Sequence, residues 1–200
     1  MAYEGDPSQA FPDSWRETIA QSSILLLQRE VPRFINIEAA KVAKANNVTV
    51  IFDLGGRDDK ITNETISLCD IISPNETELE RLLSTLPQQD EPDKQSNGSA
   101  QESSEEVKSE NSEPKAIDEA KIKLFLSYQK PGFKLLLKQG AQGSSLLWIE
   151  GSGDEIVLHK ETVPVVSFRE HPDVKLVDTT GAGDTYTAAF AVKYAQLLNQ

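Results

Sequence analysis

Residues 178–185, with the sequence DTTGAGDT, place two carboxylates and two glycines within eight positions. The run follows a strand-like segment at 175–177 and leads into small and apolar residues at 188–195, which suit a packed helix. A glycine turn at a helix N-terminus presents backbone N–H groups at the positive end of the helix dipole, where an anion such as phosphate binds. Gly181 and Gly183 also let a ligand approach the backbone closely.

Asp184 stands inside this turn, and its carboxylate has two possible roles. It can cap the helix, since Asp is a favoured residue at a helix N-terminus. It can also act as a general base, because an acid beside a phosphate cradle is placed to take the proton of an attacking nucleophile. The two glycines and the second carboxylate, Asp178, favour the chemical interpretation.

Asn75 and Glu78 form a second candidate site, directly after a predicted strand at 70–73. Their spacing is that of a capping box, in which each residue bonds to the backbone N–H of the other. The same two residues could instead contribute to the water shell of Mg2+, which often needs only one or two carboxylates besides substrate phosphates. Doubly wound sheets bind ligands at the carboxyl ends of their strands, which is where this pair falls. Both interpretations stay open.

Residues 138–143, KQGAQG, follow another predicted strand. Gly140 and Gly143 could form the turn of a hairpin into 144–150, or they could approach a ligand. Gly55 and Gly56 close a further strand in the same way. Four strand ends therefore carry glycine or acidic residues, and their convergence on one edge of a sheet is more informative than any one of them.

The elements that must position these residues alternate between strand and helix. The predicted strands are 22–28, 48–54, 70–73, 133–138, 145–149 and 155–159, besides 175–177. The predicted helices are 34–46, 65–68, 76–83, 117–129 and 188–195. This alternation indicates an α/β domain with a doubly wound, mainly parallel sheet and helices on both faces.

The length of 200 residues and a hydrophobic content of 38% suffice for one domain with a core. We expect an irregular lead-in at 1–13, followed by a partial α/β domain at 14–200. An acidic, Ser-rich insertion at 87–115 interrupts that domain, and we expect it to be disordered. Only Ala100 and Val107 are apolar there, too few side chains to offset the entropy of ordering the segment.

The charge balance and the single cysteine narrow the possible environments and partners. The net charge of -12 disfavours a nucleic-acid surface, which needs a concentrated basic face. No apolar run is long enough to span a membrane. Cys69 cannot form an intrachain disulfide, which suits a reducing compartment, and we expect an intracellular location, cytoplasmic or plastid.

Taken together, the three runs at 178–185, 75–78 and 138–143 resemble the ordered motifs of the ribokinase-like (PfkB) carbohydrate kinases. They are similar to the C-terminal signature, the Asn-Glu-x-Glu motif and the nucleotide loop of that family. Plant-like eukaryotic ribokinases show a particular likeness, through residues 26–32, 53–56 and 72–78.

The resemblance implies a lidless ribokinase-like core that transfers a phosphoryl group from ATP to a ribose hydroxyl. Asp184 would take the proton of that hydroxyl, and the amides of Gly181, Ala182 and Gly183 would form an anion hole. The aspartate Asp178 would contribute to a monovalent-cation site for K+.

The same resemblance assigns the contacts to the nucleotide and its metal. Glu78 would help to hold Mg2+, and Asn75 would lie near the phosphates. The nucleotide loop would contribute Lys138, Gly140 and Gly143.

Members of this family are markedly longer, and the sequence has no counterpart of their N-terminal sugar-binding part, their β lid or their C-terminal end. We therefore expect the isolated chain to be inactive or weakly active, and to form a homodimer only where a lid is present. Fructokinase and adenosine kinase are alternatives, because they share the Gly-Ala-Gly-Asp turn. A non-catalytic nucleotide-binding or interaction module, with the acidic insertion recruiting partners, is an alternative of a different class.

Overall fold

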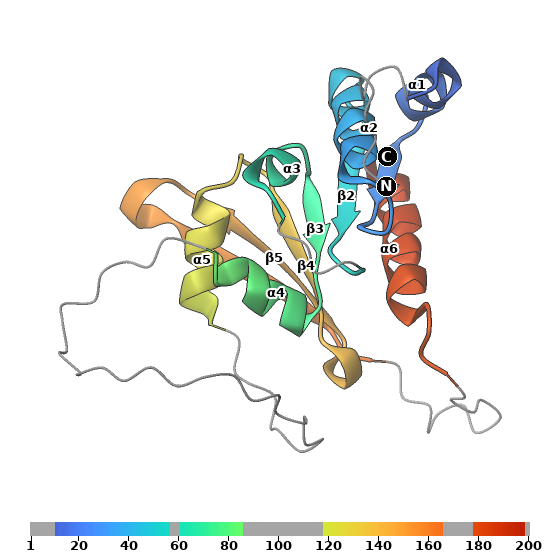
Figure 1. Cartoon of the computed structure of the whole chain (residues 1–200). Coiled ribbons are helices and arrows are strands. Elements are labelled where there is room, and N and C mark those ends of the chain that lie inside the picture. Colours follow the sequence, from blue (N-terminus) through green and yellow to red (C-terminus); the bar gives the residue numbers. More distant parts are fainter. Residues whose placement is uncertain (1–10, 57–60, 86–117, 166–177, 199–200) are drawn as a thin grey trace, which may run out of the picture.

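Six strands form one sheet in the order β1-β2-β3-β4-β5-β6 (Figure 1). The computed structural model describes residues 11–56, 61–85, 118–165 and 178–198. The strands are β1 (Ile24–Leu27), β2 (Thr49–Asp53), β3 (Ile71–Ser73), β4 (Lys134–Lys138), β5 (Ser144–Glu150) and β6 (Val157–Val163). The helices are α1 (Asp13–Ala20), α2 (Arg33–Ala45), α3 (Asn63–Ser67), α4 (Glu76–Leu83), α5 (Glu119–Ser127) and α6 (Ala182–Leu198), with 3-10 turns η1 (Gly140–Gln142) and η2 (Gly153–Glu155).

The first four strands run parallel, and β5 and β6 continue the sheet antiparallel to their neighbours. The carboxyl ends of β1 to β4 therefore meet at one edge of the sheet. The predicted α/β fold with a mainly parallel sheet is confirmed. The strand predicted at 175–177 lies outside the described residues, as does the predicted insertion at 87–115.

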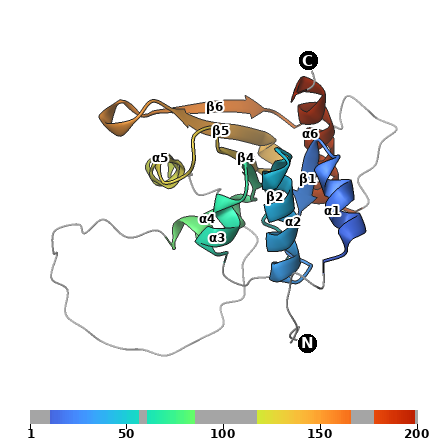
Figure 2. The ribbon, with the colours of Figure 1, turned by 90° about the horizontal axis from the view of Figure 1, so that it is seen from above.

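Two hydrophobic clusters cover the two faces of the sheet, as the period of two along β2 requires. Val50 and Phe52 belong to the larger cluster, which contains buried residues of helices α1 to α5. Ile51 points the other way and packs in a smaller cluster with Ala191 of α6. Helix α6 therefore lies on the face opposite to α2 (Figure 2).

Helix α1 begins within the segment that we expected to be irregular. Pro12 is its N-cap residue, and Asp13 is its first helical residue. Ile19 is buried, and the Phe11 ring packs edge-on against Trp15 at 5.5 Å between centroids. Residues 1–13 carry two prolines and little periodic pattern, so the sequence did not predict this helix.

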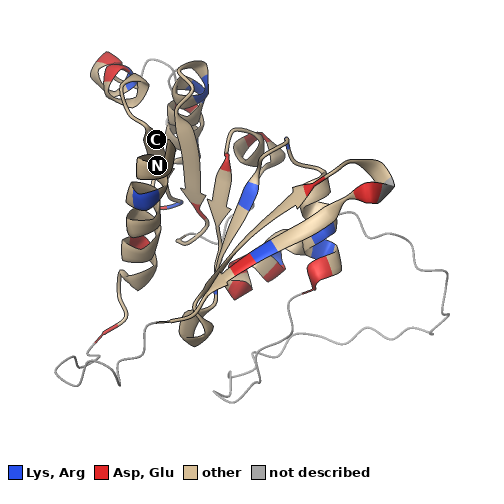
Figure 3. Cartoon of the chain, turned by 180° about the vertical axis from the view of Figure 1, so that it is seen from behind, with Lys and Arg blue, Asp and Glu red and all other residues tan. Residues whose placement is uncertain are grey.

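Acidic and basic residues are interspersed along the helices and strands (Figure 3). Within the described residues, no helix is long and apolar enough to cross a membrane. The described parts of the chain also hold no group of three or more His, Cys, Asp or Glu side chains arranged to bind a metal ion.

Candidate active site

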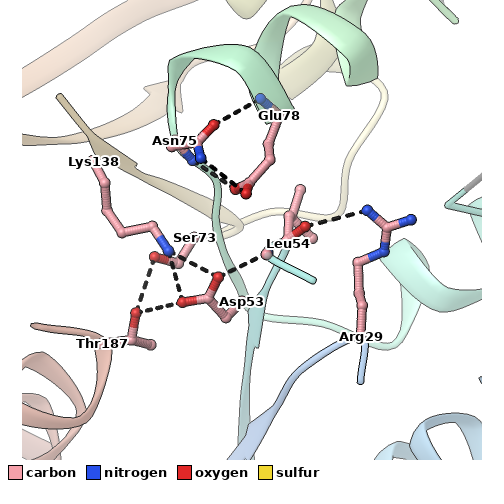
Figure 4. Close-up of polar contacts among 9 residues, drawn as sticks. Arg29, Asp53, Leu54, Ser73, Asn75, Glu78, Lys138 and Thr187 are labelled. Carbon is pink, nitrogen blue, oxygen red and sulfur yellow. Dashed lines mark hydrogen bonds and ion pairs between the residues drawn. The ribbon is translucent and has the colours of Figure 1, made fainter. Parts of the chain in front are cut away.

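The carboxyl ends of three neighbouring strands and the first turns of α6 come together at one edge of the sheet (Figure 4). Asp53 ends β2, Ser73 ends β3 and Lys138 ends β4. Thr187 of α6 donates a hydrogen bond to Asp53 Oδ2 at 2.7 Å, and its hydroxyl lies 3.4 Å from that of Ser73. The glycine turn at the start of α6 is thereby held against the strand ends.

Lys138 and Asp53 form a nearly buried ion pair at this edge. The Lys138 Nζ atom lies 2.8 Å from Asp53 Oδ1 and 2.7 Å from Oδ2. Only 16% of the lysine side chain and 9% of the aspartate side chain are exposed. We predicted Lys138 as a site residue but gave Asp53 no role. The available signal was an Asp at a strand end, two positions before a pair of glycines and on the same edge as the other candidates.

The glycines of the turn before α6 differ in their surroundings and in their backbone hydrogen bonds. Gly181 has a φ of +74°, and no heavy atom lies within 4 Å of the position that a Cβ would take there. At Gly183 the same position lies 3.7 Å from Lys138 Nζ. The amide of Ala182 donates to the Thr179 carbonyl at 3.1 Å, whereas those of Gly181 and Gly183 meet no acceptor in the described parts of the chain.

Asp184 lies in the first turn of α6 and is exposed. None of the described residues donates a hydrogen bond to its carboxylate or pairs with it. Within the described part of the chain, the side chain therefore does not cap the helix. It directly follows Gly183, at the positive end of a 17-residue helix.

Asp178 holds the backbone directly before the glycine turn through hydrogen bonds to Thr180. Its Oδ1 atom accepts hydrogen bonds from the backbone N–H and the hydroxyl of Thr180, both at 2.9 Å. These bonds, the backbone one foremost, lower the pKa of Asp178 below its usual value. The carboxylate is ionised at neutral pH and holds the turn that precedes the glycines.

Asn75 and Glu78 form the predicted capping box at the start of α4. Asn75 Oδ1 accepts from the Glu78 amide at 2.8 Å, and Glu78 Oε2 accepts from the Asn75 amide at 2.8 Å. The Asn75 side-chain amide also donates to Glu78 Oε1 at 2.9 Å. The capping interpretation is confirmed. Their predicted contacts with magnesium and phosphate stay predictions.

The backbone places this capping box beside Lys138. Asn75 pairs with Lys138 in an isolated parallel bridge, and the Lys138 amide donates to the Pro74 carbonyl at 2.9 Å. Glu78 Oε1 lies 3.7 Å from the position that a Cβ on Gly55 would take. The tertiary fold thus brings together the motifs around 75–78, 138–143 and 178–185, as the convergence of strand ends predicted.

The two glycines of the loop after β4 differ in their surroundings. The loop is the connection of an antiparallel hairpin between β4 and β5, as one of our two interpretations predicted. Gly140 has a φ of +51° and faces open space, so a ligand can approach it. A Cβ on Gly143 would collide with the Val163 carbonyl oxygen at the end of β6. Gly143 is therefore required by the packing of the chain itself, and its predicted nucleotide contact stays a prediction.

This edge of a parallel sheet combines a glycine turn at a helix N-terminus, a lysine and an exposed carboxylate, an arrangement that suits binding of an anion such as phosphate. The sequence signature described as "pfkB family carbohydrate kinase" matches residues 15–199. The chain belongs to this family of carbohydrate kinases.

Several relatives carry the name ribokinase. The chain is 39% identical to ribokinase of Arabidopsis thaliana over 177 residues, which cover 88% of this chain and 36% of that protein. It is 27% identical to ribokinase of Lactococcus lactis, with 90% of this chain and 42% of that protein covered. The solved structure of Arabidopsis thaliana ribokinase complexed with ribose and ATP superposes with a TM-score of 0.64 and 33% identity, over 94% of this chain and 49% of that one. The chain spans less than half the length of these relatives.

Proposed function

We propose that this chain forms the phosphoryl-transfer part of an ATP-dependent sugar kinase whose acceptor is a hydroxyl of ribose. The observation that carries the proposal is the exposed carboxylate of Asp184 directly after Gly183, together with the amides of Gly181 and Gly183, none of which has a hydrogen-bond partner among the described residues. The ribose and ATP named for the Arabidopsis complex support the choice of substrates.

Asp184 is the general base of the proposed reaction. Its carboxylate accepts the proton of the sugar hydroxyl while the hydroxyl oxygen attacks the γ-phosphorus of ATP and the bond to the β-phosphate oxygen breaks. The transition state of such a transfer is loose, so positioning and charge stabilisation contribute more than base strength. The unpaired amides of Gly181 and Gly183 and the ammonium of Lys138 stabilise the charge on the transferred group.

The residues near Lys138 fit a magnesium ion that arrives with the nucleotide. Such an ion needs few protein ligands because phosphates and water supply the others, and it neutralises charge on the phosphates when bound. Glu78 would hold it directly or through water, with Asn75 near the phosphates. Asp178, together with backbone carbonyls, would contribute to a K+ site.

A chimera tests this function in a context that supplies the remaining length of the enzyme. Residues 15–199 replace the matching segment of Arabidopsis ribokinase, and transfer from radiolabelled ATP to ribose is measured. We expect Asp184→Asn to lower kcat by about 100-fold to 10,000-fold, the usual contribution of a general base. Glu17→Gln, at an exposed carboxylate of α1 within the transplanted segment, is the matched control and leaves kcat unchanged.

Retention of full activity by the Asp184→Asn chimera would contradict the proposal. A chimera that folds and binds ATP without transferring phosphate would favour the non-catalytic nucleotide-binding module. Competition among ribose, fructose and adenosine as acceptors distinguishes ribokinase from the fructokinase and adenosine kinase alternatives.

A further inference from the structure

Asp53 is a buried carboxylate to which the proposed reaction gives no role. Its Oδ1 atom accepts hydrogen bonds from the Gly55 amide at 2.9 Å and from Lys138. Its Oδ2 atom accepts from Lys138 and from the Thr187 hydroxyl. Each oxygen thus accepts two hydrogen bonds, so the carboxylate is fully satisfied. It cannot take a proton or a metal ion without losing a donor that it already holds.

The donors of Asp53 come from separate parts of the site. Lys138 ends β4, and Thr187 lies in α6, four positions after Gly183. Residues four apart lie on the same side of a helix, so Thr187 anchors the side of α6 that carries Gly183. One carboxylate at the end of β2 therefore fixes both the lysine and the helix end that presents the unpaired amides.

Lys138 depends on this anchor for its position. A lysine side chain is long and flexible and carries a point charge, so its orientation has to be imposed by its partners. In the described part of the chain, the only hydrogen-bond acceptor of the Lys138 ammonium is Asp53. The ammonium lies beside Gly183, at the mouth of the glycine turn.

We propose that Asp53 is a positioning residue that holds the Lys138 ammonium and the first turns of α6 in the arrangement that receives the terminal phosphates of ATP. The inference rests on the proposed function and extends it to a residue that does not itself touch substrate. Removing the charge of Asp53 has two opposite effects on ATP binding. Removing a negative charge near a phosphate site strengthens ATP binding by electrostatics alone, whereas losing the anchor weakens it.

The test compares binding of MgATP to the 200-residue chain by titration calorimetry, in the wild type and in Asp53→Asn. We expect the Kd for MgATP to rise about tenfold in Asp53→Asn, comparable with the loss on removing an outer-shell hydrogen bond that orients a ligand-binding side chain. Asp70→Asn is the matched control. Asp70 also accepts from a backbone amide and from lysines, but it precedes β3 at the opposite edge of the sheet. It should leave the Kd within about twofold of the wild type.

A Kd that is unchanged or lower in Asp53→Asn would overturn the inference while leaving the proposed function intact. An equal rise in both variants would also overturn it, since it would show a general loss of stability. Absence of MgATP binding to the unaltered chain would overturn this inference, while the transfer assay on the chimera tests the proposed function separately.

Thr187→Val keeps the inference testable if Asp53→Asn does not fold. It removes one of the four hydrogen bonds and retains the Lys138 ion pair. We expect a rise of about threefold in Kd, with Thr187→Ser restoring the wild-type value because serine keeps the hydroxyl. Equal Kd values for Thr187→Val, Thr187→Ser and the wild type would contradict a positioning role.

Discussion

The two edges of the sheet carry aspartates with similar partners and different consequences. At the carboxyl edge, Asp53 accepts from a backbone amide and Lys138, and the pair is 9% and 16% exposed. At the amino edge, Asp70 accepts from the Val50 amide at 2.8 Å, from Lys130 at 2.6 Å and from Lys44 at 3.2 Å. Asp70 is 27% exposed and its lysines 31% and 39%. Solvent therefore weakens the interactions of Asp70 with its lysines. The Asp53–Lys138 pair is largely excluded from solvent, and Asp53 also holds α6.

The amino-edge cluster also shows how partners offset burial. Burial by itself raises the pKa of Asp70, but the hydrogen bonds from Lys130 and from the Val50 amide outweigh it, and the pKa is lowered. The neighbouring thiol of Cys69 has no comparable compensation. Its burial raises its pKa to about 12. The aspartates at the two edges therefore differ in solvent access, and only Asp53 also holds α6. Mutations at each edge can test these two differences separately.

The largest expected effect is that of Lys138→Met on stability. The substitution leaves the Asp53 carboxylate nearly buried without its counter-ion, which costs about 3–5 kcal/mol in the free energy of unfolding. Lys130→Met, at the half-exposed amino edge, should cost about 1 kcal/mol or less. Urea unfolding followed by circular dichroism measures both. Equal losses of stability would contradict the expected difference between the nearly buried Asp53–Lys138 pair and the more exposed Asp70–Lys130 pair.

A smaller effect is expected at the second attachment of α6. The Tyr186 hydroxyl donates to Ser144 Oγ at 2.6 Å, which ties α6 to the start of β5. Tyr186→Phe keeps the ring and removes this bond, so the free energy of unfolding should fall by about 0.5–1.5 kcal/mol. The Kd for MgATP should not change, because Thr187 still anchors the helix. A changed Kd would mean that Asp53 is not the anchor that matters.

The lowered pKa of Asp70 predicts the direction in which stability changes with pH. Its folded-state pKa is lowered, so its contribution to stability is present above the ordinary aspartate pKa of about 3.9 and is lost as the pH falls through the lower folded-state value. The free energy of unfolding of the wild type should exceed that of Asp70→Asn by about 1 kcal/mol at neutral pH. This difference should shrink below about pH 4. Urea midpoints at a series of pH values test this. A difference that grows in acid would be opposite in sign.

The smallest effect is expected for Lys44→Gln. Lys44 is the more exposed of the two lysines on Asp70, and Lys130 remains as a partner. Cys69, the single cysteine, reports opening of this edge, because its buried thiol reacts with a disulfide reagent only when the segment opens. We expect the labelling rate of Lys44→Gln to stay within about threefold of the wild type, as for a weak surface pair. A tenfold faster rate would show that the amino edge depends on Lys44.

Much of the candidate site followed from local patterns. The capping box at Asn75 and Glu78 spans a single turn, and its residue types and spacing predicted it as one of two open interpretations. The hairpin at Gly140 and Gly143 was one of two interpretations, because a short glycine-containing loop can either turn the chain or let a ligand approach the backbone. Which of these glycines lies beside open space was not predictable, since the chain that packs against Gly143 comes from the far end of β6.

The sequence by itself determined the strand and helix alternation, the glycine turn at the start of α6 and the carboxylate of Asp184 within it. These are short-range features, set by periodicity and by residue types within one or two turns. Only the tertiary structure decided that Asp53 anchors the site. Its partners Lys138 and Thr187 are 85 and 134 positions away in the chain, and each looks ordinary in its own segment. Burial brings these residues together, and a buried charge requires its partners to be present.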